Sequence, residues 1–320
     1  MMKTYQATFC AGSALTDLPS AQTIFGAICQ ILTDTEGEAP LAEYLDSFQD
    51  QPLMVHSSLF PEDLFPMPKR SIFSLAFVNE SVHSSNPRNK LQAMAGYKKY
   101  KKIRYVSRKI LENYILPNRF EQLQKDLLAN PERFTLLESG ILRLSSETSD
   151  YRQKTVLQTR NGSRGTTTEK DLFYTKTIYP DPAQKFSLYI KSDWPRERIE
   201  DLLMKLEIFG LGSRRTVGMN VFTLLGLKEI RLQTTGELQY LLSDCVPDEA
   251  VDLDRSCYGL QSAVFRGSKS YNGGYFTGRY TYLTPGSLIN SVNRKGWTGM
   301  LVRDESQGKT VWHYGMGFVF

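Results

Sequence analysis

The sequence is poor in the side chains that metal sites, disulfide frameworks and many catalytic centres require. It has only three histidines (His56, His83 and His313), far apart along the chain, and four cysteines, no two of which form a Cys-x-x-Cys pair. Structural zinc sites and disulfide frameworks need such ligands at characteristic spacings. We therefore predict reduced thiols, no metal site and no cofactor. Each histidine is interpreted as a structural or surface imidazole, and no catalytic residue is predicted.

Long apolar runs are also absent. No run of about 18 apolar residues occurs, so no transmembrane helix is expected. The first residues, Met1–Tyr5, have neither the apolar core nor the small-residue cleavage pattern of a signal peptide. The expectation is a cytoplasmic protein that has no membrane partner.

The composition is otherwise that of a folded protein with a mild excess of positive charge. Of 320 residues, 41% are hydrophobic and 23% are charged, with a formal net charge of +5. The length suits one large domain or two medium ones. The basic balance suits an anionic partner without requiring one.

The most informative segment is the glycine loop, residues 210–218. It contains three glycines, two hydroxyl residues and two adjacent arginines: Gly210, Gly212, Ser213, Arg214, Arg215, Thr216 and Gly218. Glycine permits positive φ and close backbone approach. Exposed N–H groups in such a turn form an anion-binding concavity, and arginine forks match phosphate geometry. The segment predicts a loop that grips a phosphodiester backbone, and a helix C-cap at Gly210 followed by a solvated turn remains the alternative.

The spacing around this loop argues against nucleotide-binding motifs. No Lys-Ser or Lys-Thr pair closes it, as a Walker A motif would require. A dinucleotide fingerprint opens a helix after a strand, whereas here a predicted helix precedes the loop and a strand follows it.

A second basic element is a predicted β-hairpin arm. Strands are expected at Tyr151–Leu157 and Leu172–Ile178, joined by the polar segment 159–170. Arg160 and Arg164 in this segment are predicted to approach RNA phosphates.

Two further basic segments lie in the first half. Lys69 and Arg70 end a proline-spaced loop that begins at Phe60, and both are candidate contacts for an anionic partner, which the resemblance described below implies is RNA. Seven of the twelve residues from 98 to 109 are Lys or Arg, with tyrosines between them, inside a region (about 86–130) predicted to be helical. A nucleic-acid surface and a solvated helix face with inward tyrosines both remain open.

The segment 244–254 is rich in carboxylates: Asp244, Asp248, Glu249, Asp252 and Asp254. A metal-dependent enzyme is one interpretation. Pro247 and the lack of a paired histidine favour a solvated acidic loop, which could face a basic surface of a neighbouring subunit.

The predicted fold class is α+β with two ferredoxin-like, RRM-like units. In the first, residues 1–148, a strand at Lys3–Phe9 precedes a helix that Ser20 caps, and the basic helical insertion follows. The second, residues 149–320, has strand, strand, helix and strand in the order of a ferredoxin-like unit and carries the arm and the glycine loop. The polar segment 145–150 marks the boundary between them.

In their order, six motifs resemble those of the Csm subunit 4 family, within the RAMP superfamily of CRISPR RNA-binding proteins. They are residues 20–27 (SAQTIFGA), 64–68 (LFPMP), 172–175 (LFYT), 210–218 (GLGSRRTVG), 285–287 (PGS) and 314–317 (YGMG). The resemblance spans nearly the whole chain. It departs from the family pattern where Met219 and Asn220 stand in place of an aromatic residue and a glycine, and where Cys10–Ala14 replaces an aromatic-Gly-Ser-Gly turn.

The resemblance implies a non-catalytic, RNA-binding subunit of a type III-A CRISPR effector, a ribonucleoprotein of antiviral defence. Such a subunit holds the 5′ handle of the crRNA and contacts two partners, the large polymerase-like signalling subunit and the backbone RAMP subunit. The main alternative is a metal-independent endoribonuclease of the same superfamily that matures crRNA. It would need a histidine, tyrosine or lysine beside the scissile 2′-OH. A structural spacer that touches no RNA is a third interpretation.

Overall fold

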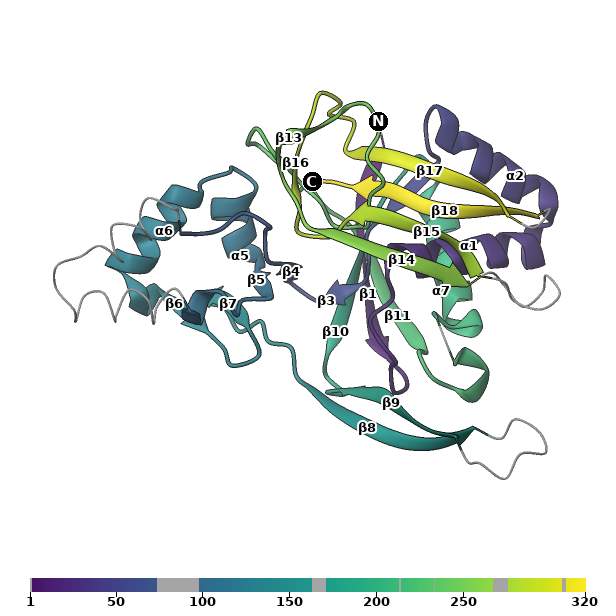
Figure 1. Ribbon diagram of the computed structural model, residues 1–320, viewed down its shortest axis with the longest axis horizontal. Coiled ribbons are helices and arrows are strands. Elements are labelled where there is room, and N and C mark those ends of the chain that lie inside the picture. Colours follow the sequence, from purple (N-terminus) through teal and green to yellow (C-terminus); the bar gives the residue numbers. More distant parts are fainter. Residues whose placement is uncertain are drawn as a thin grey trace.

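Helices and sheets are mixed along the chain, as the α+β prediction requires (Figure 1). The computed structural model describes residues 2–73, 98–162, 171–212, 214–232, 234–266, 276–306 and 309–320. No helix within these residues is long and apolar enough to cross a membrane.

A central antiparallel sheet is built from strands that lie far apart in the sequence. Its order is β11-β1-β10-β2, and the short β3 also pairs with β10. The bounds are β1 Lys3–Ala11, β2 Met54–His56, β3 Phe60–Pro61, β10 Lys185–Ser192 and β11 Phe222–Glu229. Strands from both sides of residue 148 therefore share one sheet, and the division into two ferredoxin-like units at that position stays a prediction.

Two helices join strands of this sheet. Helix α1 (Ala21–Glu36) begins where the Ser20 hydroxyl accepts a hydrogen bond from the Thr23 N–H, as predicted for the cap. Its buried face follows helical spacing and includes Ile24, Phe25, Ile28, Ile31 and Leu32. Helix α7 (Arg196–Phe209) buries Ile199, Leu202, Leu203 and Leu206. The order β1-α1-β2-β10-α7-β11 is a β-α-β-β-α-β motif in which another strand separates each helix-linked pair.

Between β3 and β10 the chain makes an insertion. Helix α2 (Glu38–Asp46) and the turn η1 (Ser47–Gln49) are not part of this insertion, because they lie between α1 and β2. The insertion itself contains a sheet of order β4-β5-β7-β6 and several helical turns. Its elements are β4 Leu64–Pro66, β5 Tyr105–Ser107, α5 Arg108–Ile110, η2 Leu111–Ile115, α6 Phe120–Ala129, η3 Pro131–Arg133, β6 Phe134–Leu136 and β7 Ile141–Leu144.

The predicted helical region 86–130 is therefore wrong in part. Residues 86–97 lie outside the described residues, and β5 interrupts the rest of the region. Strand β5 lies between β4 and β7 and buries Val106 and Ser107. Pairing with two neighbours thus overrides the local helical pattern.

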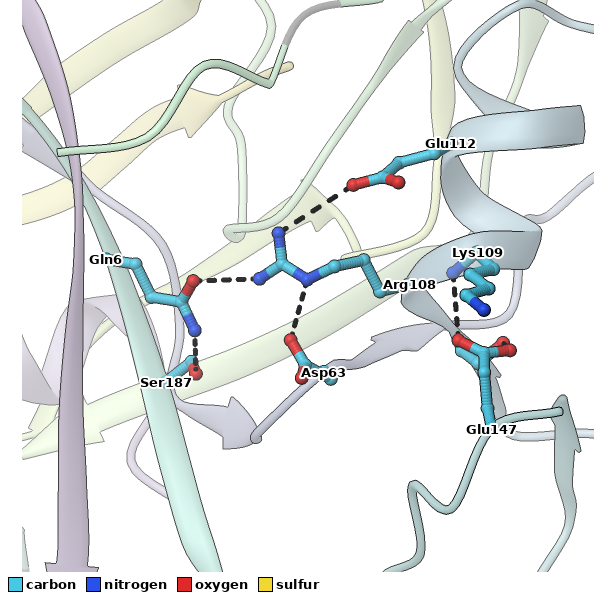
Figure 2. A network of polar contacts seen from close by, with 8 residues as sticks. Gln6, Asp63, Arg108, Lys109, Glu112, Glu147 and Ser187 are labelled. Atoms are coloured by element: carbon cyan, nitrogen blue, oxygen red, sulfur yellow. Dashed lines mark hydrogen bonds and ion pairs between the residues drawn. The ribbon is translucent and has the colours of Figure 1, made fainter. Parts of the chain in front are cut away.

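A polar network joins the insertion to the central sheet (Figure 2). The half-buried Arg108 guanidinium pairs with Asp63 (Nε to Oδ1, 2.6 Å) and donates to Gln6 Oε1 at 2.8 Å. Gln6 in turn donates to Ser187 Oγ at 2.8 Å, and Glu112 lies 3.9 Å from the guanidinium. Because a buried cation that loses its partner is costly, this network specifies how the insertion docks on β1 and β10.

The hairpin of β8 (Gln153–Gly162) and β9 (Asp171–Pro180) is a two-stranded sheet of its own (Figure 1). Strands are present at both predicted positions; β8 extends to Gly162, into the segment expected to be a loop, and β9 begins at Asp171, directly after that segment. Residues 163–170, between the two strands, lie outside the described residues.

The C-terminal third is a set of short antiparallel sheets of order β12-β16-β13, β14-β15 and β17-β18. The bounds are β12 Gln239–Tyr240, β13 Val251–Cys257, β14 Leu260–Arg266, β15 Phe276–Leu283, β16 Leu288–Ser291, β17 Trp297–Ser306 and β18 Lys309–Phe318. The buried Lys191 of β10 donates to the carbonyls of Gly296 (2.9 Å) and Val319. One large apolar core joins this third to the central sheet and the insertion.

Candidate nucleic-acid interface

The glycine loop begins where α7 ends and takes positive φ repeatedly. Gly210 (φ 69°), Gly212 (φ 90°), Arg214 (φ 60°) and Gly218 (φ 77°) all have positive φ. The Gly210 N–H still caps the helix by donating to the Leu206 carbonyl at 2.9 Å. The predicted C-cap at Gly210 is therefore present, and phosphate binding by the loop that follows it stays a prediction.

A short helical turn, η4 (Arg215–Val217), begins at the second arginine of the loop, and the left-handed Arg214 directly precedes it. Arg215 is exposed and Arg214 is partly exposed. Neither takes part in any ion pair among the described residues, and within that part of the chain their side chains make one hydrogen bond, from Arg215 to the Phe209 carbonyl at 3.5 Å. Their charge is thus open to an anionic ligand. Ser213 and the side chain of Thr216 lie outside the described part.

Asn220 fastens the end of the loop, a role that the sequence did not predict. Asn220 is buried and left-handed (φ 58°), and its Oδ1 accepts from the Thr16 N–H at 2.8 Å while its Nδ2 donates to Thr16 Oγ1 at 3.0 Å. Its carbonyl also accepts from the Leu211 N–H at 3.1 Å. Asparagine tolerates this backbone region better than most residues, and so it can stand where the family pattern has glycine. The asparagine at this position of the family pattern was the sequence feature that could have indicated this role.

Residues 12–16, here called the strap, connect the glycine loop with the hairpin. On one side the Asn220 N–H donates to the Ala14 carbonyl at 3.0 Å. On the other, Leu15 and Ile178 of β9 exchange two backbone hydrogen bonds of 2.8 Å. The base of the hairpin and the end of the glycine loop therefore lie on either side of one extended segment.

The hairpin presents apolar surface to solvent. Leu157 and Tyr174 are 70% and 73% exposed. The register pairs Leu157 with Lys176 and Thr159 with Tyr174, which puts these side chains on one face of the ribbon. An exposed tyrosine next to a lysine is a surface on which a nucleic-acid base can stack. Arg160 pairs with Phe173 in the register, and its side chain is not described; Arg164 lies outside the described residues.

Lys69 and Arg70 lie in different surroundings. The Lys69 N–H donates to the Gly286 carbonyl at 2.8 Å, and the Arg70 guanidinium lies 5.1 Å from the centre of the Phe120 ring of α6. Both side chains are exposed. Among the described contacts none joins them to the glycine loop, so the structure brings together the loop and the hairpin but does not add these two cations to them.

The two described histidines are buried. His56 stacks on Tyr314 with ring centres 4.5 Å apart, and burial lowers the pKa of His56 to about 4. His313 lies beside Tyr280 and is 3% exposed, and burial lowers its pKa. His83 lies outside the described residues.

The carboxylates of the segment 244–254 are dispersed. Burial raises the pKa of Asp244 to about 6, whereas Asp248 accepts from the Gly299 N–H at 3.0 Å on β17. Asp252 and Asp254 lie exposed on β13. Within the described residues, no group of three or more His, Cys, Asp or Glu side chains is placed to hold a metal ion.

The fold and the site define an α+β protein that presents an exposed cationic glycine loop beside a projecting hairpin. No family model and no curated protein matches the sequence. Solved structures do match the fold. One is a chain of the Csm3-Csm4 subcomplex in the type III-A CRISPR-Cas interference complex, at a TM-score of 0.64 and 15% identity, covering 99% of this chain and 98% of the other.

A second similar structure is a chain of the Csm1-Csm4 cassette in complex with pppApA, at a TM-score of 0.58 and 18% identity, covering 99% of this chain and 97% of the other. The full-length fold is thus consistent with the Csm subunit 4 fold that the sequence motifs predicted.

Proposed function

We propose that this protein is a non-catalytic RNA-binding subunit of a type III-A CRISPR effector complex that holds the 5′ handle of the crRNA. The observation that carries the proposal is the similarity of fold over the full length of chains from the Csm3-Csm4 and Csm1-Csm4 structures. In this proposal the motif β1-α1-β2-β10-α7-β11 is the first ferredoxin-like unit, and its sheet order supports that assignment. The C-terminal third then supplies the second unit.

RNA binding is assigned to the glycine loop and the hairpin together. Recognition of single-stranded RNA uses cations for the phosphates and exposed aromatic rings for the bases. Arg214 and Arg215 supply the first, and Tyr174 supplies the second. The strap holds both elements, and so one strand of RNA can contact the loop and the hairpin.

The partners proposed are the large polymerase-like subunit and the backbone RAMP subunit. Similar chains occur in structures named for Csm1 with Csm4 and for Csm3 with Csm4. A subunit that contacts both would bridge the signalling subunit and the backbone of the complex.

The endoribonuclease alternative finds less support. Its general acid or base would have to reach a scissile 2′-OH at the surface. His56 and His313 are both buried, so neither imidazole reaches the surface; His83 lies outside the described residues, and a tyrosine or lysine site stays the open form of this alternative.

The test is the variant Arg214→Ala/Arg215→Ala, assayed for binding to repeat-derived RNA. Each charge-assisted phosphate contact contributes about 1.5–3 kcal/mol, so the affinity should fall at least roughly tenfold. The salt dependence of binding should become shallower, because fewer counterions are released.

The matched control is Lys228→Ala/Arg231→Ala, which removes two exposed cations from the end of the sheet that lies away from the loop. Equal affinities and equal salt slopes for the two variants would refute the assignment of the glycine loop.

A further inference from the structure

A second group of exposed cations lies on the insertion, apart from the glycine loop and the hairpin. Residues 98–104, here called the basic turn, leave β5 on its N-terminal side. Five of its seven side chains are cationic and exposed: Lys98, Lys99, Lys101, Lys102 and Arg104. The sequence left a solvated helix face open here. Among the described residues, Lys98–Tyr100 are helical, and Lys101 and Lys102 form a turn before the chain reaches β5.

The basic turn is held firmly against the insertion. Ile103 is buried, and the ring of Tyr100 packs against Phe73 with centres 5.3 Å apart. The N–H of Arg104 donates to the Gly140 carbonyl at 2.8 Å. A Cβ at Gly140, where φ is +81°, would lie 2.8 Å from the Lys102 carbonyl, so only glycine lets the two backbones approach this closely. The lysines thus project from a fixed backbone.

The charge of the basic turn is not neutralised within the described part of the protein. The ion pairs among the described residues include none of its four lysines. Arg104 donates to the Ser139 carbonyl, which is an uncharged partner. Arg108, four residues on, shows the contrast, since it is half buried and has two carboxylates beside it. Like charges gathered on a surface without a neighbouring counter-ion favour an external polyanion.

The basic turn is connected to the base of the hairpin through the residue that follows it. Tyr105, the next residue, packs its ring against Tyr151 with centres 6.3 Å apart, directly before the hairpin. Burial raises the pKa of both tyrosines; the charge of Asp17 raises it further and the charge of Arg104 opposes the rise, so both charged groups lie near the two rings. Asp17 directly follows the strap. A chain of contacts therefore runs from the glycine loop through the strap and the hairpin base to the basic turn.

We propose that the basic turn is a second phosphate-binding surface for the same single-stranded RNA, which crosses the hairpin base to reach it. The proposal rests on the proposed function, because the glycine loop holds one part of that RNA. Four ammonium groups on flexible stems bind phosphates as point charges without reading bases. The basic turn should therefore contribute affinity and salt dependence but no sequence preference.

The experiment compares three variants of the full chain for binding to poly(U) and to repeat-derived RNA over a range of salt concentrations. The first is Lys98→Gln/Lys99→Gln/Lys101→Gln/Lys102→Gln. The second, the matched control, is Lys3→Gln/Lys228→Gln/Arg231→Gln/Lys295→Gln, which lowers the net charge equally. Lys3 lies about 30 Å from the strap along β1, and Lys228, which pairs with Gln6, lies about 20 Å from it. The third is Arg214→Ala/Arg215→Ala.

The slope of log K against log salt should fall by about 0.7 for each phosphate that the protein no longer neutralises, so by about 2–3 in the basic-turn variant, on both RNAs. The control should keep the wild-type slope. A basic-turn variant that matches the control on both RNAs overturns the proposal, and so does one that binds RNA normally but no longer binds a partner subunit. If only Arg214→Ala/Arg215→Ala loses affinity, the proposed function stands and this inference fails; if only the basic-turn variant does, the assignment of the glycine loop fails instead.

Discussion

Replacing Asn220 by alanine is expected to destabilise the protein by about 2–5 kcal/mol. The substitution removes the acceptor of the Thr16 N–H and the donor to the Thr16 hydroxyl, at 2.8 and 3.0 Å. A partly buried N–H that loses its acceptor costs about 1–3 kcal/mol. Alanine in the left-handed region costs a further 1–2 kcal/mol or so, because its Cβ approaches the carbonyl oxygen that follows. Total stabilities of roughly 5–15 kcal/mol make such a loss easy to measure.

Asn220→Gly separates the two contributions. Glycine adopts φ of 58° without strain but makes no side-chain hydrogen bond, so this variant should lie between wild type and Asn220→Ala. The assay is urea unfolding followed by circular dichroism, together with RNA binding. Arg214→Ala/Arg215→Ala should show the opposite behaviour, with weaker RNA binding and unchanged unfolding. The reasoning is refuted if Asn220→Ala unfolds at the wild-type urea concentration, or if glycine is no better than alanine.

Two further predictions concern the hairpin and the buried imidazole. Replacing residues 163–170 by a short glycine linker should weaken RNA binding and leave the melting temperature within about 2 °C, because β8 and β9 pair with each other along their length and the bridge from Ile178 to Leu15 lies at the other end of the hairpin; a large drop in melting temperature would place the hairpin in the core. The pKa of His56 is about 4 in the folded protein and 6.5 in the unfolded chain, so the folded protein binds fewer protons between these values. The contribution of His56 to the free energy of unfolding is therefore fully present above pH 6.5 and falls by about 3 kcal/mol as the pH falls toward 4. The difference in unfolding free energy between wild type and His56→Phe should therefore change over this pH window, and a difference that stays constant would contradict the prediction. The raised pKa of Asp244 has the opposite effect on stability, but Asp244 is present in both proteins and so does not affect the difference.

Local patterns predicted the regular elements well where one face of an element is buried. The cap at Ser20 gave α1, a helix was expected before the glycine loop where α7 lies, and the strand expected at Lys3–Phe9 is β1. Strand β5 was missed, because its three residues are strand only through pairing with β4 and β7. Four C-terminal strands were missed for the same reason: β13, β14, β16 and β17. Single-sequence patterns hold no record of such long-range partners.

The candidate site, too, was predictable from the sequence only where its properties are local. Glycines that need positive φ and arginines that stay exposed are local properties, and so the glycine loop was found. Grouping Lys69 and Arg70 with it was an inference from charge alone, and in the structure these residues contact α6 and the Gly286 turn. The strap had no signal of its own, since its role depends on what lies on each side of it.

The position of the strap explains how the proposed RNA-binding site can be assembled from segments so far apart in sequence. Strand β1 is central in its sheet, between β10 and β11, and it ends at the strap. The hairpin directly precedes β10 and the glycine loop precedes β11. Both strands are antiparallel to β1 and begin beside its C-terminal end, so the hairpin and the glycine loop lie at that end. The Ala14 carbonyl accepts a backbone hydrogen bond at the end of the glycine loop, and Leu15 exchanges two with β9 at the base of the hairpin. The RNA-contacting side chains can therefore stay exposed, because the rigidity of the site comes from the backbone beneath them.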